Sequence, residues 1–591
     1  MSCPLFSIIR AATGRGLSSV CQKQKLDTLR PDVNFGMGSC SMRTAALLFL
    51  LASPAAFTQT AALSAPPTTS ATTPAPFPGG PSTPLGQQVQ AITSAPAAAR
   101  AHWGIAVTAL DGTPIYGLNE GEFFRPASNN KLFTTAAAMH LFGPTDTVST
   151  VARITAGIDK HGAVMGDIAL VGAGDANLSG RVLPYLSPAE RKRQTEASGQ
   201  PVPAPDPLRY IDEMAAAVAA KGIRHIKGNV IGDDSLWPWE PYASDWSIDD
   251  AVWGYGAPVS ALTIDDNQLD LTIEPAAEPG KPATAKLSPE TGYYTLQVKV
   301  QTVAAKSPAS IRIDRSIGSR VFQISGTVAV GEPYSTEVAI EDPAEFAAQA
   351  FKSALENHGV KVDGKALAQH ARSVDTQGFS SESHEPIPTL PAKPRHLEQS
   401  PLGGGPVPPP IEVTHRSPSL ADDVKLTLKV SQNLHAELLL RRLGQMYGTD
   451  GSSAQGARVV RQFLLNAGLD GDDFAFYDGS GLSGHDLVTP RATAKLLTYA
   501  TGQPWFAQWK ASLPVGGEDG TLAGRFAKPP LKDHLFAKTG TLSEARALSG
   551  YVDCASGSTV IFSIMVDNHA PNTPADREAM DSIVAAIAAN N

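Results

Sequence analysis

Alternating apolar and polar positions mark a β-hairpin near the start of the folded region. Residues 102–118 hold two alternating runs around an Asp-Gly dipeptide, a pair that favours a tight turn between strands. Apolar positions then follow a helical pattern over 128–142, which a Gly-Pro pair ends. The pattern therefore predicts a hairpin followed closely by a helix.

Residues 145–375 change to short apolar runs that predict mainly strands. Two helical segments interrupt them at 207–221 and 343–357, and a polar loop is expected at 186–206. The predicted strands are 149–155, 166–172, 226–232, 259–264, 268–273, 293–301, 309–313 and 321–329. We interpret 146–373 as one or two β-rich domains inserted into a host domain.

The host pattern resumes after a Pro/Gly-rich loop at 374–411. The expected helices are 420–429, 432–445, 453–467, 490–500 and 574–589, and the expected strands are 534–540, 547–553 and 558–566. A hairpin at one end and strands at the other predict an α+β fold whose terminal strands share one antiparallel sheet. The host domain would then comprise 86–145 and 412–591.

The N-terminal region resembles an export signal in an unusual place. Basic Met42-Arg43 precedes a short apolar run and small residues up to Ala65, so 42–65 is interpreted as a signal peptide, with a buried core helix as the alternative. Residues 1–41 then form an upstream extension with no role in export, and translation is expected to start at Met37 or Met42. A Pro/Ser/Thr-rich linker follows at 66–85. We expect an exported protein of the periplasm or cell-wall space, with no stable membrane anchor.

Composition excludes several classes of function. The 591 residues carry a net charge of −9, which argues against a nucleic-acid partner because such proteins present basic surfaces. Three of the four cysteines lie before residue 41, so the bulk of the chain can form no internal disulfide. The sequence has no P-loop, HExxH or paired-cysteine motif, and 172–180 lacks the last glycine of a dinucleotide loop. No cofactor and no metal are expected.

Three short motifs combine hydroxyls, amines and amides. Ser128 and Lys131 are three apart at a helix start, where the amine can reach the hydroxyl and free backbone N–H groups favour negative charge. The alternative is that Ser128 is only a helix cap. Ser431 and Asn433 lie between two helices, where the hydroxyl could relay a proton and the amide could hold a peptide.

The third motif is a strand segment near the C-terminus. Lys538 and Thr539 are followed by Gly540 and Thr541, so positive charge and hydroxyls flank a position where a ligand's backbone can approach closely. Here the alternative is a solvated lysine on an edge strand.

In this order the three motifs resemble those of active-site-serine penicillin-binding proteins and β-lactamases. The long gap between Ser128 and Ser431 resembles the D-alanyl-D-alanine carboxypeptidase/endopeptidase family of low-molecular-mass penicillin-binding proteins (class C, peptidase family S13). The flanking segments that resemble this family are GDIALVGAGDANL (166–178), GNVIGDDSLW (228–237), GYGAPVSALTIDDN (254–267), DGSGLS (478–483), SLPVGGEDGTLAGRF (512–526) and AKTGTLSEARALSGYV (537–552). The resemblance runs from about residue 90 to the end, except at 186–206 and 374–411. It implies a β-lactamase/transpeptidase-like domain with β-rich inserts.

The resemblance also implies roles. Ser128 would attack the peptide bond between two terminal D-alanines of peptidoglycan, with Lys131 as base and Ser431 as proton donor to the leaving amine. The amide of Asn433 would hold the substrate. The terminal carboxylate would bind the third motif, at Lys538, Thr539, Gly540 and Thr541.

Two further roles follow from the same resemblance. Backbone N–H groups of Ser128 and Thr541 would bind the oxyanion, and β-lactams would be covalent inhibitors. Burial and the nearby charge of Lys538 would lower the pKa of Lys131. Asp249, in an acidic segment with Asp250, would read an amino group on the peptide stem, with a solvated turn as the alternative.

Two other functions remain open from the sequence. A β-lactamase or esterase could share this scaffold, but it would need a base for rapid deacylation, and no extra base is evident. A non-catalytic peptidoglycan-binding or β-lactam-sensing module is the second alternative. A sensor is expected to have membrane segments, and no apolar stretch after the signal is long enough to be one.

Overall fold

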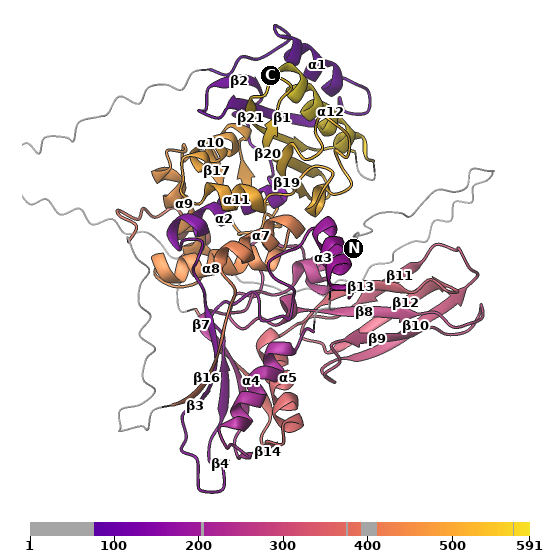
Figure 1. The fold of residues 1–591 in the computed structure, drawn as a ribbon, viewed down its shortest axis with the longest axis vertical. Helices are drawn as coiled ribbons and strands as arrows, with labels where there is room; N and C mark the ends of the chain where they lie inside the picture. The colour runs from indigo at the N-terminus through magenta and orange to yellow at the C-terminus, as the bar shows by residue number, and fades with distance from the viewer. Residues whose placement is uncertain (1–75, 203–205, 374–375, 392–409, 571–572) are drawn as a thin grey trace, which may run out of the picture. The chain divides into compact units, whose positions relative to one another are not determined.

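The computed structural model describes residues 76–202, 206–373, 376–391, 410–570 and 573–591 (Figure 1). The predicted signal peptide at 42–65 and the extension at 1–41 lie outside these residues, as does the first half of the linker, 66–75. Within the described ranges, no helix is both long and apolar enough to span a membrane.

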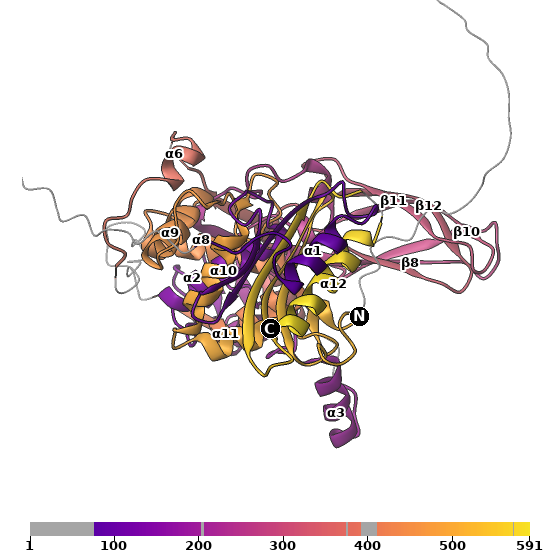
Figure 2. The same ribbon diagram turned by 90° about the horizontal axis from the view of Figure 1, so that it is seen from above.

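A five-stranded antiparallel sheet unites the two ends of the described chain. Its order is β19-β20-β21-β1-β2, which confirms the α+β class and the shared terminal sheet. The strands are β1 (His102–Ala109), β2 (Pro114–Leu118), β19 (Leu535–Thr541), β20 (Ala545–Asp553) and β21 (Thr559–Asp567). Helices α1 (Pro84–Thr93) and α12 (Ala575–Asn590) cover one face (Figures 1 and 2).

Helices cover the other face of this sheet and form the larger core. They are α2 (Asn130–Leu141), α7 (Leu420–Val430), α8 (Asn433–Tyr447), α9 (Ser453–Asn466), α10 (Pro490–Thr501) and α11 (Phe506–Ser512). A two-stranded ribbon of β17 (Phe474–Ala475) and β18 (Leu487–Val488) adjoins them.

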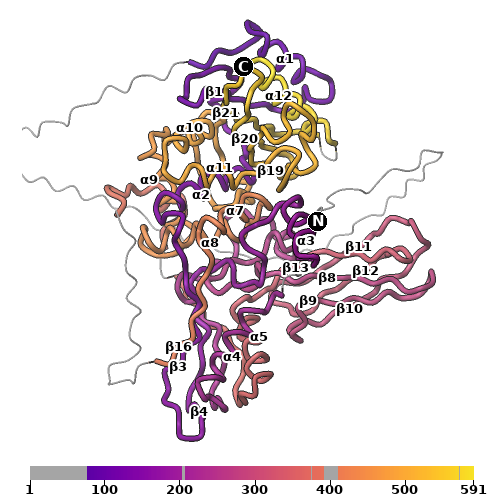
Figure 3. The backbone as a smooth tube through the Cα atoms, viewed as in Figure 1, coloured from indigo at the N-terminus to yellow at the C-terminus, as the bar shows by residue number. Residues whose placement is uncertain are grey.

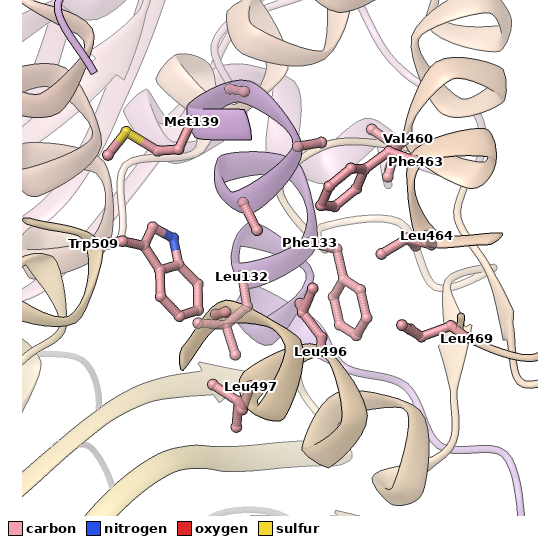
Figure 4. Close-up of a cluster of buried hydrophobic side chains, with 14 of the residues drawn as sticks. Leu132, Phe133, Met139, Val460, Phe463, Leu464, Leu469, Leu496, Leu497 and Trp509 are labelled. Atoms are coloured by element: carbon pink, nitrogen blue, oxygen red, sulfur yellow. The ribbon is translucent and has the colours of Figure 1, made fainter. Parts of the chain in front are cut away.

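Helix α2 is the centre of this packing. Figure 4 shows its Leu132 and Phe133 among side chains of α9 and α10, with Trp509 beside them. The indole of Trp509 donates to Thr135 Oγ1 at 3.0 Å, which gives this buried N–H a partner beside α2. Helix α2, which carries Lys131 of the first motif, is therefore packed against several neighbouring helices.

The insert leaves this domain after α2. Its main sheet has the order β15-β7-β5-β3-β16, with α4 (Arg209–Ala220) and α5 (Pro343–Asn357) packed on it. The strands are β3 (Ser149–Ile154), β5 (Ile168–Val171), β7 (Val230–Pro238), β15 (Ala366–Ala371) and β16 (Ile411–Arg416). A small three-stranded sheet contains β4 (Ala163–Val164), β6 (His225–Ile226) and β14 (Lys361–Val362). Because β16 pairs with β3, the insert's sheet takes its last strand from beyond the 374–411 segment, past the expected domain boundary.

Two smaller sheets extend the insert, as the backbone trace shows (Figure 3). Their strands are β8 (Gln268–Glu274), β9 (Thr284–Ser288), β10 (Thr295–Val303), β11 (Ser310–Asp314), β12 (Val321–Ala329) and β13 (Tyr334–Ala339). The sequence patterns missed β9 and β13 here, and β4, β14, β15 and β16 in the other sheets of the insert.

Two local predictions were wrong. The segment 186–206 contains helix α3 (Pro188–Ser198), closed by a capping box at Ser187 and Glu190 and by left-handed Gly199. Residues 259–264 form no strand, although all of their apolar side chains are buried. An apolar run alone does not distinguish a strand from a buried irregular segment. Within the segment expected as a loop, helix α6 (Phe379–Ser383) forms a short turn.

Candidate active site

Ser128 lies on a tight turn that precedes α2. The turn η1 (Ala127–Asn129) is a 3₁₀ helix, and Ser128 makes no capping bond to α2, so the cap interpretation does not describe it. Ala127 has a left-handed φ of 46°, and a Cβ on Gly481 would lie 1.8 Å from its carbonyl oxygen. Only glycine at 481 lets the neighbouring segment pack against this strained turn.

Lys131 links the first motif to the second motif and to the loop at Ser480. Its Nζ lies 2.9 Å from Ser128 Oγ, 2.6 Å from Asn433 Oδ1 and 2.7 Å from the carbonyl oxygen of Ser480. A neutral amine has two N–H bonds and one lone pair. With Asn433 and Ser480 accepting the two hydrogens, the lone pair faces the Ser128 hydroxyl.

The pKa of Lys131 is lowered to about 8, and burial is the main cause. The buried carboxyls of Asp478, Glu437 and Asp486 act in the opposite direction. The sequence predicted that the charge of Lys538 would lower the pKa of Lys131. The structure shows the reverse influence: burial and the proximity of Lys131 hold the pKa of Lys538 well below its ordinary value. The two amines therefore cannot both readily hold a proton at neutral pH.

Lys538 approaches the second motif from strand β19. Its Nζ donates to Ser431 Oγ at 2.8 Å and to the carbonyl oxygen of Thr539 at 2.7 Å, and the residue is fully buried. Among the described residues, no carboxylate pairs with this amine. A buried amine without an anionic partner is suited to an anionic ligand.

The second motif joins α7 to α8. Ser431 ends α7 in the left-handed region with a φ of 63°, and Asn433 is the first residue of α8. Asn433 Nδ2 donates to the carbonyl oxygen of Tyr255 at 2.9 Å, so this side chain contacts both Lys131 and the insert.

The third motif lies at the edge of the sheet beside η1. A Cβ on Gly540 would come within 2.5 Å of the carbonyl oxygen of Pro126, so only glycine permits this approach of β19 to the first motif. Thr539 Oγ1 lies 2.8 Å from Thr521 Oγ1, and Thr541 is exposed. The structure thus brings together Ser128, Lys131, Ser431, Asn433, Lys538, Thr539, Gly540 and Thr541.

A buried carboxylate network below Lys131 had no predicted role. Asn130 Nδ2 donates to Asp478 Oδ1 at 3.2 Å and to Asp486 Oδ2 at 2.9 Å. The backbone N–H groups of the following turn bond Asp478, and the pKa of Asp486 is raised well above its usual value by burial. The segment DGSGLS, which resembled the family, was the available signal for this network.

The acidic segment of the insert adjoins the site through Tyr255. Asp249 is exposed, whereas Asp250 Oδ1 accepts from the Tyr255 hydroxyl at 2.7 Å. Burial raises the pKa of Asp250. Asp250, rather than Asp249, is thus the carboxyl tied to a residue that contacts Asn433.

The donor set offers little for a metal. Across the ranges that the structure covers, no group of three or more His, Cys, Asp or Glu side chains could hold a metal ion. The site consists of hydroxyls, amines and amides, a set suited to acyl transfer through a serine ester.

Comparison with known proteins identifies the family of the chain. Residues 85–390 and 409–589 match the model of the D-Ala-D-Ala carboxypeptidase 3 (S13) family. The chain is 32% identical over 519 residues to a D-alanyl-D-alanine carboxypeptidase of an Actinomadura species, covering 86% of this chain and 85% of that protein. It is 25% identical over 451 residues to the D-alanyl-D-alanine carboxypeptidase DacB of Haemophilus influenzae, covering 75% and 80%.

Solved structures share the fold. The crystal structure of penicillin binding protein 4 (dacB) from Haemophilus influenzae superposes with a TM-score of 0.64 at 22% identity, covering 84% of this chain and 97% of that one. The same protein complexed with a β-lactam gives a TM-score of 0.59 at 20% identity, covering 85% and 98%. The family match spans most of the sequence and both sides of the insert, so the chain belongs to the D-Ala-D-Ala carboxypeptidase 3 (S13) family.

Proposed function

We propose that this protein is a serine-type D-Ala-D-Ala carboxypeptidase, and an endopeptidase on cross-links of the same chemistry, that acts on peptidoglycan peptides through an acyl-enzyme on Ser128. The observation that carries the proposal is the environment of Lys131. Its amine is buried, has two fixed acceptors, and lies 2.9 Å from the Ser128 hydroxyl. That arrangement is suited to a general base.

In the acylation step, Lys131 takes the proton of Ser128 as Oγ bonds the carbonyl carbon of the penultimate D-alanine. Backbone N–H groups of Ser128 and Thr541 receive the oxyanion. When the C–N bond breaks, Ser431 gives its proton to the leaving amine and takes one from the Lys538 ammonium at 2.8 Å. The lysine pair holds one proton before attack and one after the amine leaves. The proximity of Lys131 lowers the pKa of Lys538, which favours release of the Lys538 proton once Lys131 has taken up that of Ser128.

Deacylation runs the same steps in reverse, with water in place of the amine. Water gives a proton through Ser431 to Lys538, its oxygen bonds the acyl carbon, and Lys131 returns its proton to Ser128 as the ester breaks. Atoms and charge balance, and no further base is needed.

Substrate binding follows from the charges. Lys538 and the hydroxyls of Thr539 and Thr541 bind the terminal carboxylate, and Asn433 holds the peptide amide. A substrate carboxylate at Lys538 also favours the ammonium that the mechanism requires there.

The acidic segment of the insert reads the peptide stem. Asp249 is exposed and binds an amino group of the stem, while Asp250 supports Tyr255 behind it. Asp249→Asn and Asp250→Asn form a matched pair for this assignment. In Asp249→Asn, turnover of a stem peptide with a free side-chain amine should fall. Turnover of the same peptide with that amine acetylated should not change. If both stems are cleaved as by the wild type, Asp249 has no such role.

Export to the periplasm or cell-wall space through the 42–65 segment places the enzyme with its substrate. Expression in a bacterial host tests this export. N-terminal sequencing of the secreted protein should show that the chain is cleaved after the 42–65 segment. An intact cytoplasmic chain would contradict it.

Labelling with a fluorescent penicillin tests the central assignment. The wild type and Ser556→Ala, an exposed serine far along the chain, should label, and Ser128→Ala should not. Steady hydrolysis of the penicillin instead of a lasting adduct would favour a β-lactamase. Absence of labelling in every variant would favour a binding module. Digestion of purified muropeptides, followed as D-alanine release against loss of dimers, separates carboxypeptidase from endopeptidase activity.

A further inference from the structure

The middle residue of the second motif is held by a carboxylate of the insert. Gln432 Nε2 donates to Asp266 Oδ2, and Gln432 Oε1 accepts from the backbone N–H of Leu434 at 3.0 Å. Both ends of the Gln432 side chain are therefore fixed, one by the insert and one by the start of α8. Its neighbours on either side are Ser431 and Asn433.

Asp266 is itself fixed by two cations. It is fully buried, its Oδ1 lies 3.1 Å from His435 Nε2, and Arg181 donates to its Oδ2. His435 Nδ1 lies 2.7 Å from Asp423 Oδ1, so the imidazole lies between two carboxylates. Arg181, Asp266, His435 and Asp423 thus form a buried row of alternating positive and negative groups. This alternation offsets the free-energy cost of removing the charges from water.

The backbone on both sides of the contact is strained. Asp265, Asp266 and Asn267 have successive φ values of 48°, 56° and 54°, and Ser431 has a φ of 63°. Residues other than glycine rarely adopt this region, and such strain persists only where surrounding contacts enforce it. Asn267 supplies one of these contacts, because its Nδ2 donates to the carbonyl oxygen of Pro258 at 2.9 Å.

We propose that Asp266 is a positioning residue for the second motif, which acts through Gln432 to hold Ser431 and Asn433 in register with the two catalytic lysines. This rests on the proposed function. Gln432 joins the two residues that contact Lys538 and Lys131, so a shift of this link moves both contacts together. The insert then has a role in catalysis apart from reading the substrate.

The leaving group provides a selective measurement. An amine must be protonated to leave, and Ser431 supplies that proton in the mechanism above. A thiol with a pKa near 8.5 leaves as the thiolate and needs no proton. Misplacement of Ser431 should therefore slow cleavage of an amide far more than cleavage of a thiolester with the same acyl group, whereas general loss of folded protein would lower both equally.

The test compares Asp266→Asn and Gln432→Ala on a D-Ala-D-Ala peptide and its thiolester analogue. Each variant should lower kcat on the amide by about 100-fold, with a much smaller loss on the thiolester. Asp265→Asn is the matched control, because its carboxyl lies in the same strained turn without a hydrogen bond to Gln432 among the described contacts. It should keep the wild-type ratio of the two rates.

The double variant Asp266→Asn/Gln432→Ala should lose no more than the worse single variant, since both substitutions remove one link. Equal losses on amide and thiolester, or an unchanged ratio in Gln432→Ala, would overturn the proposal. Gln432 is partly exposed, so its variant tests the link even if Asp266→Asn does not fold. Failure of the proposed function is distinct, since the wild type would then cleave neither substrate, or Ser128→Ala would retain its activity.

Discussion

The Nζ of Lys538 donates to Ser431 Oγ across 2.8 Å, although 107 residues separate them. One comes from a strand of the terminal sheet and the other from the C-terminus of α7. Neither element fixes this contact alone. Packing of α7 against the sheet domain brings a buried amine to the hydroxyl that we assign to leaving-group protonation.

Lys538→Met should weaken recognition of the substrate carboxylate. Methionine has a similar length and fills the buried position without the charge. We expect KM for a peptide ending in D-Ala-D-Ala to rise at least about tenfold, as is typical when a charged hydrogen bond is lost. The same peptide with a C-terminal carboxamide should be a poor substrate for both proteins. If Lys538→Met still preferred the carboxylate as strongly as the wild type, this amine would not be its binding group.

Thr521 is a second test of carboxylate recognition. Its hydroxyl oxygen lies 2.8 Å from that of Thr539. When the Thr521 hydroxyl donates this hydrogen bond, the Thr539 hydroxyl hydrogen is free to donate to the substrate carboxylate. Thr521→Val keeps the shape and removes this bond, so KM should rise a fewfold with little change in thermal stability, because the side chain is exposed. Thr521→Ser should restore KM. A valine variant with wild-type KM would show that Thr539 needs no such orientation.

Part of this site could be predicted from the sequence because some of its contacts are local. Ser128 and Lys131 are three residues apart, so a single helical turn brings amine and hydroxyl together. The contact between Gln432 and Asp266 spans 166 residues and depends on how the insert packs on α8, which no periodicity encodes. The association of the three motifs came from their resemblance to a family, whose segments at 254–267 and 478–483 had no role assigned.

Helix α3 shows a different limit. All its residues are polar or small and none is buried, so no apolar stripe revealed it. Ser187, Glu190 and Gly199 carried the signals at its ends, as a capping box and a left-handed C-cap. Terminal signals are thus the better guide for a helix that is exposed on all sides.

Packing of α2 should dominate the stability of the site. Phe133 is fully buried and contacts Phe476 with ring centroids 4.8 Å apart. Phe133→Ala should lower the free energy of unfolding by about 3–5 kcal/mol, since it removes contacts and leaves a cavity. Denaturant unfolding measures this, with exposed Phe123→Ala as the control, for which little change is expected. A loss below about 1 kcal/mol in Phe133→Ala would mean that the core closes around the cavity.

The pH dependence of acylation should report the protonation of Lys131. Only the neutral amine can accept the Ser128 proton, and its pKa of about 8 means that the neutral fraction grows as pH rises. The second-order rate of penicillin labelling should therefore rise with pH toward a maximum near pH 8 and fall above it, because Lys538 must keep the proton that Ser431 passes to the leaving amine. An unperturbed lysine, with a pKa near 10.4, would still show a steep rise at pH 9.

Glu437→Gln provides the control for this assignment. The Glu437 carboxylate is buried near Lys131 and raises the pKa of that amine, but burial raises the pKa of Glu437 itself to about 8, so it is only partly ionised in this range. Its removal should therefore move the rise in labelling rate to lower pH by a small amount. Glu437 contacts neither Ser128 nor the third motif among the described hydrogen bonds, and it bonds the backbone N–H of Gly479 at 3.0 Å. A midpoint that stays in place, or moves to higher pH, would show that the titrating group is not Lys131. Labelling followed from pH 5.5 to 9.5 in both proteins measures the shift directly.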